Sequence, residues 1–352
     1  MKSNRILQGN VLDRLKDLPD RSIQCVVTSP PYWGLRDYGT AEWEGGDEDC
    51  KHKEKELRND TSEKWKSMEE TKGFQYKKEC PECGAKRVDK QLGLEETPEE
   101  YVEKMVEVFK QVKRVLKHDG TVWLNLGDSY GNGKQLTGIP WRMAFALQAD
   151  GWYLRQDIIW HKPNPMPESV RDRCTKSHEY IFLLSKSAKY FYDADAIKTP
   201  LKDESMRRLM QDIENQEGSD RVPGKTNGPM KAVGGKDWQK NMDGDGLKMK
   251  GKSGYFDKDG YPICGSMANR KSVWKINTKP YKGAHFATFP PELPELCIKA
   301  GSSEGDVVLD PFFGSGTTGW VAQRLGRKWI GIELNQEYIE LAEKRFVQHE
   351  LF

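Results

Sequence analysis

The chain has 352 residues, of which 36% are hydrophobic and 31% charged, and this length suits one large α/β domain with insertions or two smaller domains. No stretch approaches the roughly 20 apolar residues of a membrane span, and the charged start lacks the apolar core of a signal peptide, so we expect no membrane association. The net charge of +2 excludes a globally basic protein, and binding to nucleic acid would need local patches. Seven cysteines without an export signal do not indicate a disulfide framework, and we expect a cytoplasmic location.

Short apolar runs alternate with segments of helical periodicity along the chain. Strands are predicted at 5–7, 23–27, 121–126, 158–160, 180–184, 272–274, 307–309 and 329–332. Helices are predicted at 11–18, 97–116, 141–148, 317–325 and from 336 onward. In the clearest helix, Thr97 can cap, Pro98 suits the first position and Glu100 completes a capping box, while His118–Gly120 is expected to end it. This alternation favours an α/β fold with a doubly wound, mostly parallel sheet.

Two segments depart from this pattern. Residues 39–90 are dense in charge and poor in apolar periodicity, which is typical of an insertion. Residues 200–270 have no regular pattern and are rich in lysine and glycine. From Lys225 to Lys282, 13 Lys/Arg stand against 5 Asp/Glu, and this local excess of positive charge is compatible both with a solvated loop and with contacts to a nucleic acid.

A glycine-rich loop follows the apolar run 307–309, with the sequence Asp-Pro-Phe-Phe-Gly-Ser-Gly-Thr-Thr-Gly at 310–319. Its Gly-x-Gly-x-x-Gly spacing is typical of a tight turn from strand to helix, where the backbone comes close to a ligand. Glu333, at the end of the next strand, is placed to bind ribose hydroxyls. The lysine of a nucleoside triphosphate loop is absent, whereas NAD remains open from the loop alone.

A second loop, Ser29-Pro30-Pro31-Tyr32, follows the apolar strand at 23–27. Because prolines fix φ and lack an N–H, this loop presents oxygen acceptors. The Ser29 hydroxyl and the Pro30 carbonyl could hold the two hydrogens of a planar amino group out of the ring plane, which directs its lone pair toward an electrophile. Tyr32 would stack on a base, and Trp33 is a second candidate contact. The same geometry suits an amino group in DNA, in RNA or on a protein glutamine.

Together the two loops resemble those of the β class of S-adenosylmethionine-dependent DNA amino-methyltransferases, in which the catalytic loop precedes the cofactor loop. The resemblance implies a Rossmann-like methyltransferase fold, S-adenosylmethionine as cofactor and double-stranded DNA as substrate. It implies catalytic roles for the Ser29–Tyr32 loop. It assigns cofactor binding to Asn10, His285, Phe289, Asp310, Phe312, Gly314, Ser315, Gly316, Thr317 and Glu333.

Asn10 departs from the family's pattern, which often has Gly-Asp where this chain has Gly9-Asn10. Its amide oxygen can still accept a hydrogen bond from the adenine amino group of the cofactor. The segments at 160–164 and 178–180 resemble the family's middle motifs, near the target base.

The atom that is methylated is only partly indicated by the residues. Methylation of cytosine carbon-5 needs a cysteine nucleophile, usually after a proline, whereas Cys25 lies inside an apolar strand and Cys80 precedes Pro81. N4 of cytosine and N6 of adenine remain. In the family that the chain resembles, Ser-Pro-Pro-Tyr is commoner in cytosine enzymes, so we favour N4 of cytosine and keep N6 of adenine as the alternative.

A structural zinc site is predicted in the charged insertion. Cys50, His52, Cys80 and Cys83 supply four ligands of the right type, and Cys-x-x-Cys-Gly is a common zinc knuckle. Free thiols in a solvated loop are the alternative. A zinc-containing DNA-binding protein without catalytic activity is a further alternative for the whole chain.

The expected domain organisation divides the chain into four parts. The catalytic half of the methyltransferase domain comprises 1–38 and 91–190, the insertion 39–90, the target-recognition region 191–275 and the cofactor-binding half 276–352. Beyond DNA, the candidate partners are a second copy of the chain and a cognate restriction endonuclease.

Overall fold

The computed structural model describes residues 2–34, 42–47, 49–50, 52, 56–57, 74–75, 79–88, 91–131, 134–201, 255–256, 262–263, 267–279 and 289–350. The chain forms two compact units. The larger comprises Met1–Asp193 and Ser272–Phe352, and the smaller comprises Ala194–Lys271. In the described part of the chain, no helix has both the length and the apolar character that crossing a bilayer requires.

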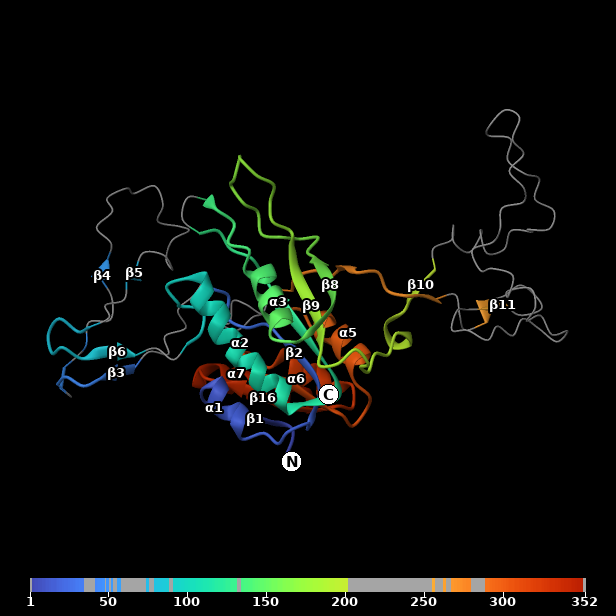
Figure 1. Cartoon of the computed structure of the whole chain (residues 1–352), viewed down its shortest axis with the longest axis horizontal. Coiled ribbons are helices and arrows are strands. Elements are labelled where there is room, and N and C mark those ends of the chain that lie inside the picture. Colours follow the sequence, from blue (N-terminus) through green and yellow to red (C-terminus); the bar gives the residue numbers. More distant parts are fainter. Residues whose placement is uncertain are drawn as a thin grey trace. The chain divides into compact units, whose positions relative to one another are not determined.

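The centre of the larger unit is an eight-stranded sheet with the order β1-β16-β15-β2-β7-β9-β8-β14 (Figure 1). In that order, the strands span Arg5–Gln8, Lys328–Glu333, Val307–Asp310, Ile23–Thr28, Leu116–Leu126, His178–Ser185, Tyr153–His161 and Val273–Lys275. All pairings are parallel except those of β9 with β7 and β8. The predicted doubly wound, mostly parallel sheet is therefore confirmed. Because β9 alone runs the other way, it begins at the edge where its neighbours end.

Helices cover both faces of this sheet. On one side, α1 (Val11–Lys16), α2 (Pro98–Val115) and α3 (Ile139–Ala149) pack against one another and the sheet. On the other side lie α5 (Glu292–Gly301) and α6 (Thr317–Arg324), and α7 (Gln336–Glu350) packs beside α6. Helix α5 was not predicted, because Pro294 within it and the two prolines before it interrupt the helical pattern.

The long helix α2 begins as predicted but its capping differs in detail. The Thr97 hydroxyl accepts a hydrogen bond from the Glu100 backbone at 3.2 Å. The Glu100 carboxylate, however, accepts from the backbone of Glu96 at 3.2 Å, so the reciprocal bond of a capping box is not made. The predicted end at residue 116 lies one residue beyond the observed end at Val115, but His118–Gly120, expected to stop the helix, already belong to β7.

The core follows from this layering. Every residue of β2 is buried, as expected of a strand covered on both faces. The α2 side chains that face the sheet, among them Met105, Phe109 and Val112, are fully buried against it. The burial of each such side chain contributes about 1.5–3 kcal/mol to folding. This packing holds in place the strands whose ends carry the site.

The two segments without pattern contain short antiparallel strand pairs. In the insertion, β3 (Glu42–Glu44) pairs with β6 (Lys86–Val88), and β4 (Glu56–Leu57) pairs with β5 (Phe74–Gln75). In the smaller unit, β10 (Thr199–Pro200) pairs with β13 (Met267–Ala268), and β11 (Tyr255–Phe256) pairs with β12 (Pro262–Ile263). A single turn of 3-10 helix, Asp195–Ile197, precedes β10.

Candidate functional site

A cavity of about 880 Å³ opens at the carboxyl edge of the sheet. The loop Ser29–Tyr32, named here the acceptor loop, reaches the cavity from β2. The glycine loop at 310–319 reaches it from β15, and these two strands are neighbours. Ser29, Tyr32 and Gly314 all line this cavity. The shared crevice that the sequence predicts for two loops at parallel strand ends is thus present in the molecule.

Hydrogen bonds fix the position of the acceptor loop and of Trp33 beside it. The Pro31 carbonyl accepts a hydrogen bond from the Tyr101 hydroxyl at 2.9 Å, which ties the loop to α2. Trp33, predicted as a second base contact, instead donates its ring N–H to the Glu95 carbonyl at 2.9 Å and packs against the core. It is not among the residues that line the cavity.

Tyr32 lies against a glycine. A Cβ atom on Gly127, just after β7, would stand 2.6 Å from Cε2 of the Tyr32 ring. The absence of a side chain at Gly127 therefore lets the ring lie close to the strand end. Tyr32 remains part of the cavity wall, where it can offer its ring to a base.

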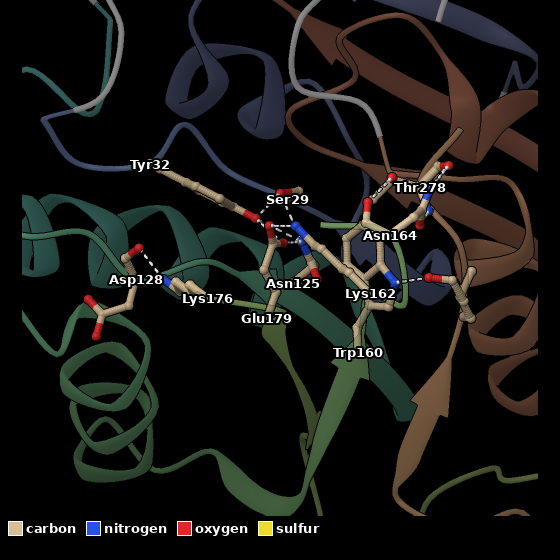
Figure 2. A network of polar contacts seen from close by, with 11 residues as sticks. Ser29, Tyr32, Asn125, Asp128, Trp160, Lys162, Asn164, Lys176, Glu179 and Thr278 are labelled. Carbon is tan, nitrogen blue, oxygen red and sulfur yellow. Dashed lines mark hydrogen bonds and ion pairs between the residues drawn. The ribbon is translucent and has the colours of Figure 1, made fainter. Parts of the chain in front are cut away.

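The Tyr32 hydroxyl belongs to a polar network (Figure 2). It donates to Oε2 of Glu179 at 2.7 Å and accepts from the Asn125 amide at 2.8 Å. The same amide donates to Glu179 at 2.8 Å and approaches the Ser29 hydroxyl at 3.4 Å. Lys162 forms an ion pair with the other carboxylate oxygen of Glu179. The network joins Ser29 and Tyr32 to β7, to β9 and to Lys162 just after β8.

The electrostatics of this network favour a charged Glu179. Burial acts to raise the pKa of Glu179, but the Lys162 ammonium and the hydrogen bonds from Tyr32 and Asn125 hold that pKa below its usual range. Burial, and then the negative charge of Glu179, raise the pKa of Tyr32 well above its usual value. Tyr32 is therefore a neutral hydrogen-bond donor to an ionised carboxylate.

The segments of Lys162 and Glu179 were predicted to lie near the target base, but neither residue was singled out, and Asn125 was not predicted. A signal for Asn125 existed, because it is the one polar residue in the run 122–126, which is otherwise apolar. Glu179 lies at the site because β9 runs antiparallel to its neighbours, and the sequence does not predict this direction.

The glycine loop has the conformation that its residues suggest. Gly314 has φ +51° and Gly316 has φ +76°, values that favour glycine. Gly314 lines the cavity, whereas Gly316 packs toward Ala342 and Phe346 of α7 and is not among the cavity-lining residues. The loop thus brings one glycine to the cavity and uses the other for the turn into α6.

Asp310 connects the two loops. Its carboxylate accepts from the hydroxyl of Thr28 and from that of Thr318, both at 2.7 Å, and from the Phe312 backbone at 3.1 Å. Burial raises the pKa of Asp310 to about 7. Because Thr28 ends β2 and Thr318 lies in α6, Asp310 fixes the acceptor loop relative to the glycine loop.

Glu333 and Asn10 lie on the same side of the cavity. The Glu333 carboxylate accepts from the backbone of Gly314 at 2.7 Å and of Asn335 at 2.9 Å, and burial raises its pKa. The Asn10 side-chain oxygen accepts from the backbone of Leu12 at 2.9 Å and caps α1. Of the other predicted cofactor residues, those that line the cavity are Phe289, Asp310, Phe312, Ser315 and Thr317. His285 lies outside the described residues.

These residues fit a nucleoside with a charged sulfonium tail. Phe289, Phe312 and Leu334 supply apolar walls, and Glu333 supplies acceptor oxygens suited to ribose hydroxyls. The hydroxyl of Ser315 is buried and has no hydrogen-bond partner among the residues that the structure describes. A bound polar group would satisfy it.

A second cluster of chemically active side chains lies in the charged insertion. The ligand atoms of Cys50, His52, Cys80 and Cys83 all lie within 4.8 Å of one another. The Cys50 and Cys80 sulfurs are 3.8 Å apart, and the Cys83 sulfur is 3.3 Å from Nδ1 of His52. A tetrahedron with Zn–S bonds of about 2.3 Å has sulfurs about 3.8 Å apart, so the arrangement suits zinc.

Known proteins resemble this chain along most of its length. The DNA methylase family model, N6_N4_Mtase, matches residues 23–344. Type II methyltransferase M.XycI of Xanthomonas campestris pv. cyanopsidis is 37% identical, over 98% of this chain and 88% of that protein. Type II methyltransferase M.SmaI of Serratia marcescens is 38% identical, over 99% of this chain and 92% of that protein.

Solved structures share the fold at lower identity. The PvuII DNA methyltransferase (cytosine-N4-specific) matches with a TM-score of 0.56 and 18% identity, over 98% of this chain and 87% of that one. A Thermus thermophilus protein, TTHA0409, solved in complex with S-adenosyl-L-methionine, matches with a TM-score of 0.51 and 20% identity, over 98% of this chain and 93% of that one.

Proposed function

Because the chain belongs to the DNA methylase family and is an S-adenosylmethionine-dependent DNA amino-methyltransferase, we propose that its target is N4 of cytosine. The observation that carries this choice is the Ser-Pro-Pro-Tyr sequence of the loop that lines the cavity, which is commoner in cytosine enzymes of the family than in adenine enzymes. The fold match to an enzyme described as cytosine-N4-specific supports it. Family membership leaves no role for NAD and excludes the non-catalytic alternative.

Residues of the acceptor loop position the target base for methyl transfer. Ser29 Oγ and the Pro30 carbonyl accept the two amino hydrogens, so the nitrogen lone pair points out of the base plane. Tyr32 offers its ring to the base, and such stacking contributes about 1–3 kcal/mol. Glu179 and Asn125 hold the Tyr32 hydroxyl, and the negative charge of Glu179 favours the positive charge that develops on the amino nitrogen. S-adenosylmethionine, when bound, supplies an electrophilic methyl group on its sulfonium.

We propose that the cofactor lies between Glu333, Ser315 and the apolar walls, and that Asn10 borders its adenine. Since Asn10 already caps α1, its oxygen would accept a second hydrogen bond.

Nucleoside analysis tests the choice of base. DNA from cells that express the protein is digested and analysed by mass spectrometry, and modified-base sequencing locates the site. We expect N4-methylcytosine at one short sequence. N6-methyladenine in its place would overturn the choice of base and leave the family assignment intact.

We further propose that the insertion binds one structural zinc ion through Cys50, His52, Cys80 and Cys83. Gly46 supports the site, because a Cβ there would stand 2.8 Å from the Cys83 sulfur. Metal analysis of the purified protein should give one zinc per chain. Cys80→Ser should remove it, whereas Cys174→Ser, at an exposed free cysteine, should not. Zinc-free wild-type protein with a cooperatively folded insertion would refute the site.

Residues 191–275, which include the smaller unit, are proposed as the target-recognition region because they are rich in lysine and glycine. Type II relatives make a cognate restriction endonuclease a proposed partner in the cell. A homodimer is a further proposal, and light scattering of the purified protein tests it. A monomer at micromolar concentration would refute it.

A further inference from the structure

The loop between β8 and β9, residues 162–177, extends away from the sheet edge in Figure 1. We propose that Met166 on this loop enters the DNA helix and fills the space that the target base leaves. The proposal rests on the DNA-methylating activity and is independent of which base is modified.

The loop segment that carries Met166 is stiff. Prolines at 163, 165 and 167 fix every second φ angle, and each disfavours helical backbone in the residue before it. Its start is anchored to the chain after β14. The Asn164 side chain donates to the Thr278 carbonyl at 3.1 Å and accepts from the Thr278 backbone at 2.9 Å (Figure 2).

The returning part of the loop is braced as well. The Glu168 carboxylate accepts from Arg173 at 2.6 Å and from the Lys176 backbone at 3.1 Å. The Arg173 guanidinium lies 4.4 Å from the centre of the Tyr130 ring, which joins this loop to the one after β7. At the base of the loop, Lys162 donates its backbone N–H to the Ser177 carbonyl at 2.7 Å.

Within this braced loop, Met166 is left in solvent. It is 85% exposed, more than any other large apolar side chain in the described part of the chain. It also lines the cavity that holds Ser29 and Tyr32. A stiff loop that presents an apolar side chain at the rim of the site is arranged for a partner with apolar surface in that place.

The DNA substrate supplies such a surface. The acceptor oxygens lie inside the cavity, so the target base must leave the helix, and its departure exposes the apolar faces of the adjacent base pairs. An unbranched, adaptable thioether side chain can enter between base pairs, as apolar wedges do in other DNA-binding proteins. Lys134 and Arg173 on the same two loops are paired with Asp172 and Glu168, so they brace the loops beside the cavity.

The test compares Met166→Ala with Met166→Leu and with Phe145→Ala. Phe145, on α3, is 57% exposed and lies outside both the cavity lining and the proposed target-recognition region. The probe is a short duplex with the site located by modified-base sequencing, made once with a matched target base and once with that base mispaired. Fluorescence of an aminopurine at the target position reports extrusion, and a methylation assay reports the rate.

With the matched duplex, Met166→Ala should reduce the aminopurine signal and lower kcat/KM by about tenfold or more, whereas Met166→Leu and Phe145→Ala should stay within about threefold of wild type. Mispairing makes extrusion easier, so it should restore the alanine variant to within about threefold of wild type. Equal losses on matched and mispaired duplexes, or no loss on either, would overturn the proposal. If wild-type protein methylates neither duplex, the proposed function fails instead.

Discussion

Asp310 places a carboxylate in the protein interior between the two loops, with only 2% of the residue exposed. Burial raises its pKa to about 7, although hydrogen bonds from Thr28 and Thr318 favour the charged form. The native protein therefore binds a proton at this residue more tightly than the unfolded chain does. Stability from Asp310 is greatest below about pH 4, where both states are protonated, and falls as the pH rises toward 7.

The substitution Asp310→Asn should remove this pH dependence. Between about pH 4 and pH 7, the free energy of unfolding of wild type should fall by roughly 2–4 kcal/mol relative to the variant. Urea unfolding at several pH values measures this difference. A constant difference over that range would show that the native carboxyl has an ordinary pKa. The exposed Asp13→Asn variant is the matched control.

Glu179 gives a second prediction at the same scale. Glu179→Gln keeps the shape but removes the charge that pairs with Lys162 and accepts from Tyr32. Methylation should slow about 10–100-fold, because the Tyr32 hydroxyl loses its ionised acceptor. Affinity for S-adenosylmethionine should change less than about threefold, because Glu179 belongs to the base side of the cavity.

The control for this variant is Glu99→Gln, which removes an exposed ion pair with Arg142 on the protein surface. It should leave both rate and cofactor affinity unchanged, since such pairs contribute about 1 kcal/mol or less. Wild-type kinetics in Glu179→Gln would mean that the network only fills space.

At the scale of elements, the end of β7 determines where Tyr32 lies. Gly127→Ala would place a Cβ 2.6 Å from the Tyr32 ring and force the ring to move. We expect methylation to fall at least about tenfold with little change in stability, because misplaced catalytic groups lose rate steeply. Gly131→Ala is the control, since its Cβ would find its nearest neighbour at 3.4 Å. Full activity in Gly127→Ala would argue against a fixed ring position.

The sequence predicts elements where the apolar period is regular, and it fails where prolines or direction reversals intervene. The buried run of β2 and the apolar face of α2 were predicted because their side-chain spacing matches the period of the element. Helix α5 was missed because Pro294 lies within its first turn, where a helix tolerates proline. The ends of α2 depend on side-chain contacts that spacing does not determine.

The same limit applies to the site. Ser29, Tyr32 and Gly314 could be predicted because their loops follow buried apolar runs and parallel strand ends share an edge. Glu179 lies 147 residues after Tyr32 and meets it only because β9 runs against its neighbours. Such a contact depends on strand order and direction, which local sequence does not encode.

For the whole molecule, strand order explains how two loops so far apart in sequence form one site. Strands β2 and β15 are neighbours although β2 ends at Thr28 and β15 starts at Val307. Since both run the same way, their following loops emerge together. The catalytic loop can therefore precede the cofactor loop in the chain without any change in the chemistry of the cavity.

The larger unit has its own hydrophobic core and its own cavity. Among the residues that the structure describes, every member of the main core and every residue that lines the cavity lies outside Ala194–Lys271. Replacement of Ala194–Lys271 by a short glycine–serine linker should leave cooperative unfolding, and cofactor affinity within about threefold of wild type, because neither depends on the removed residues.

The same deletion should abolish preference for the recognition sequence, since the proposed base contacts lie in the removed unit. Calorimetry with the cofactor and competition binding between specific and random duplexes measure the two properties separately. A deletion variant that keeps its preference for the site would place recognition in the larger unit, and one that loses cofactor binding would show that the cavity depends on the smaller unit for its shape.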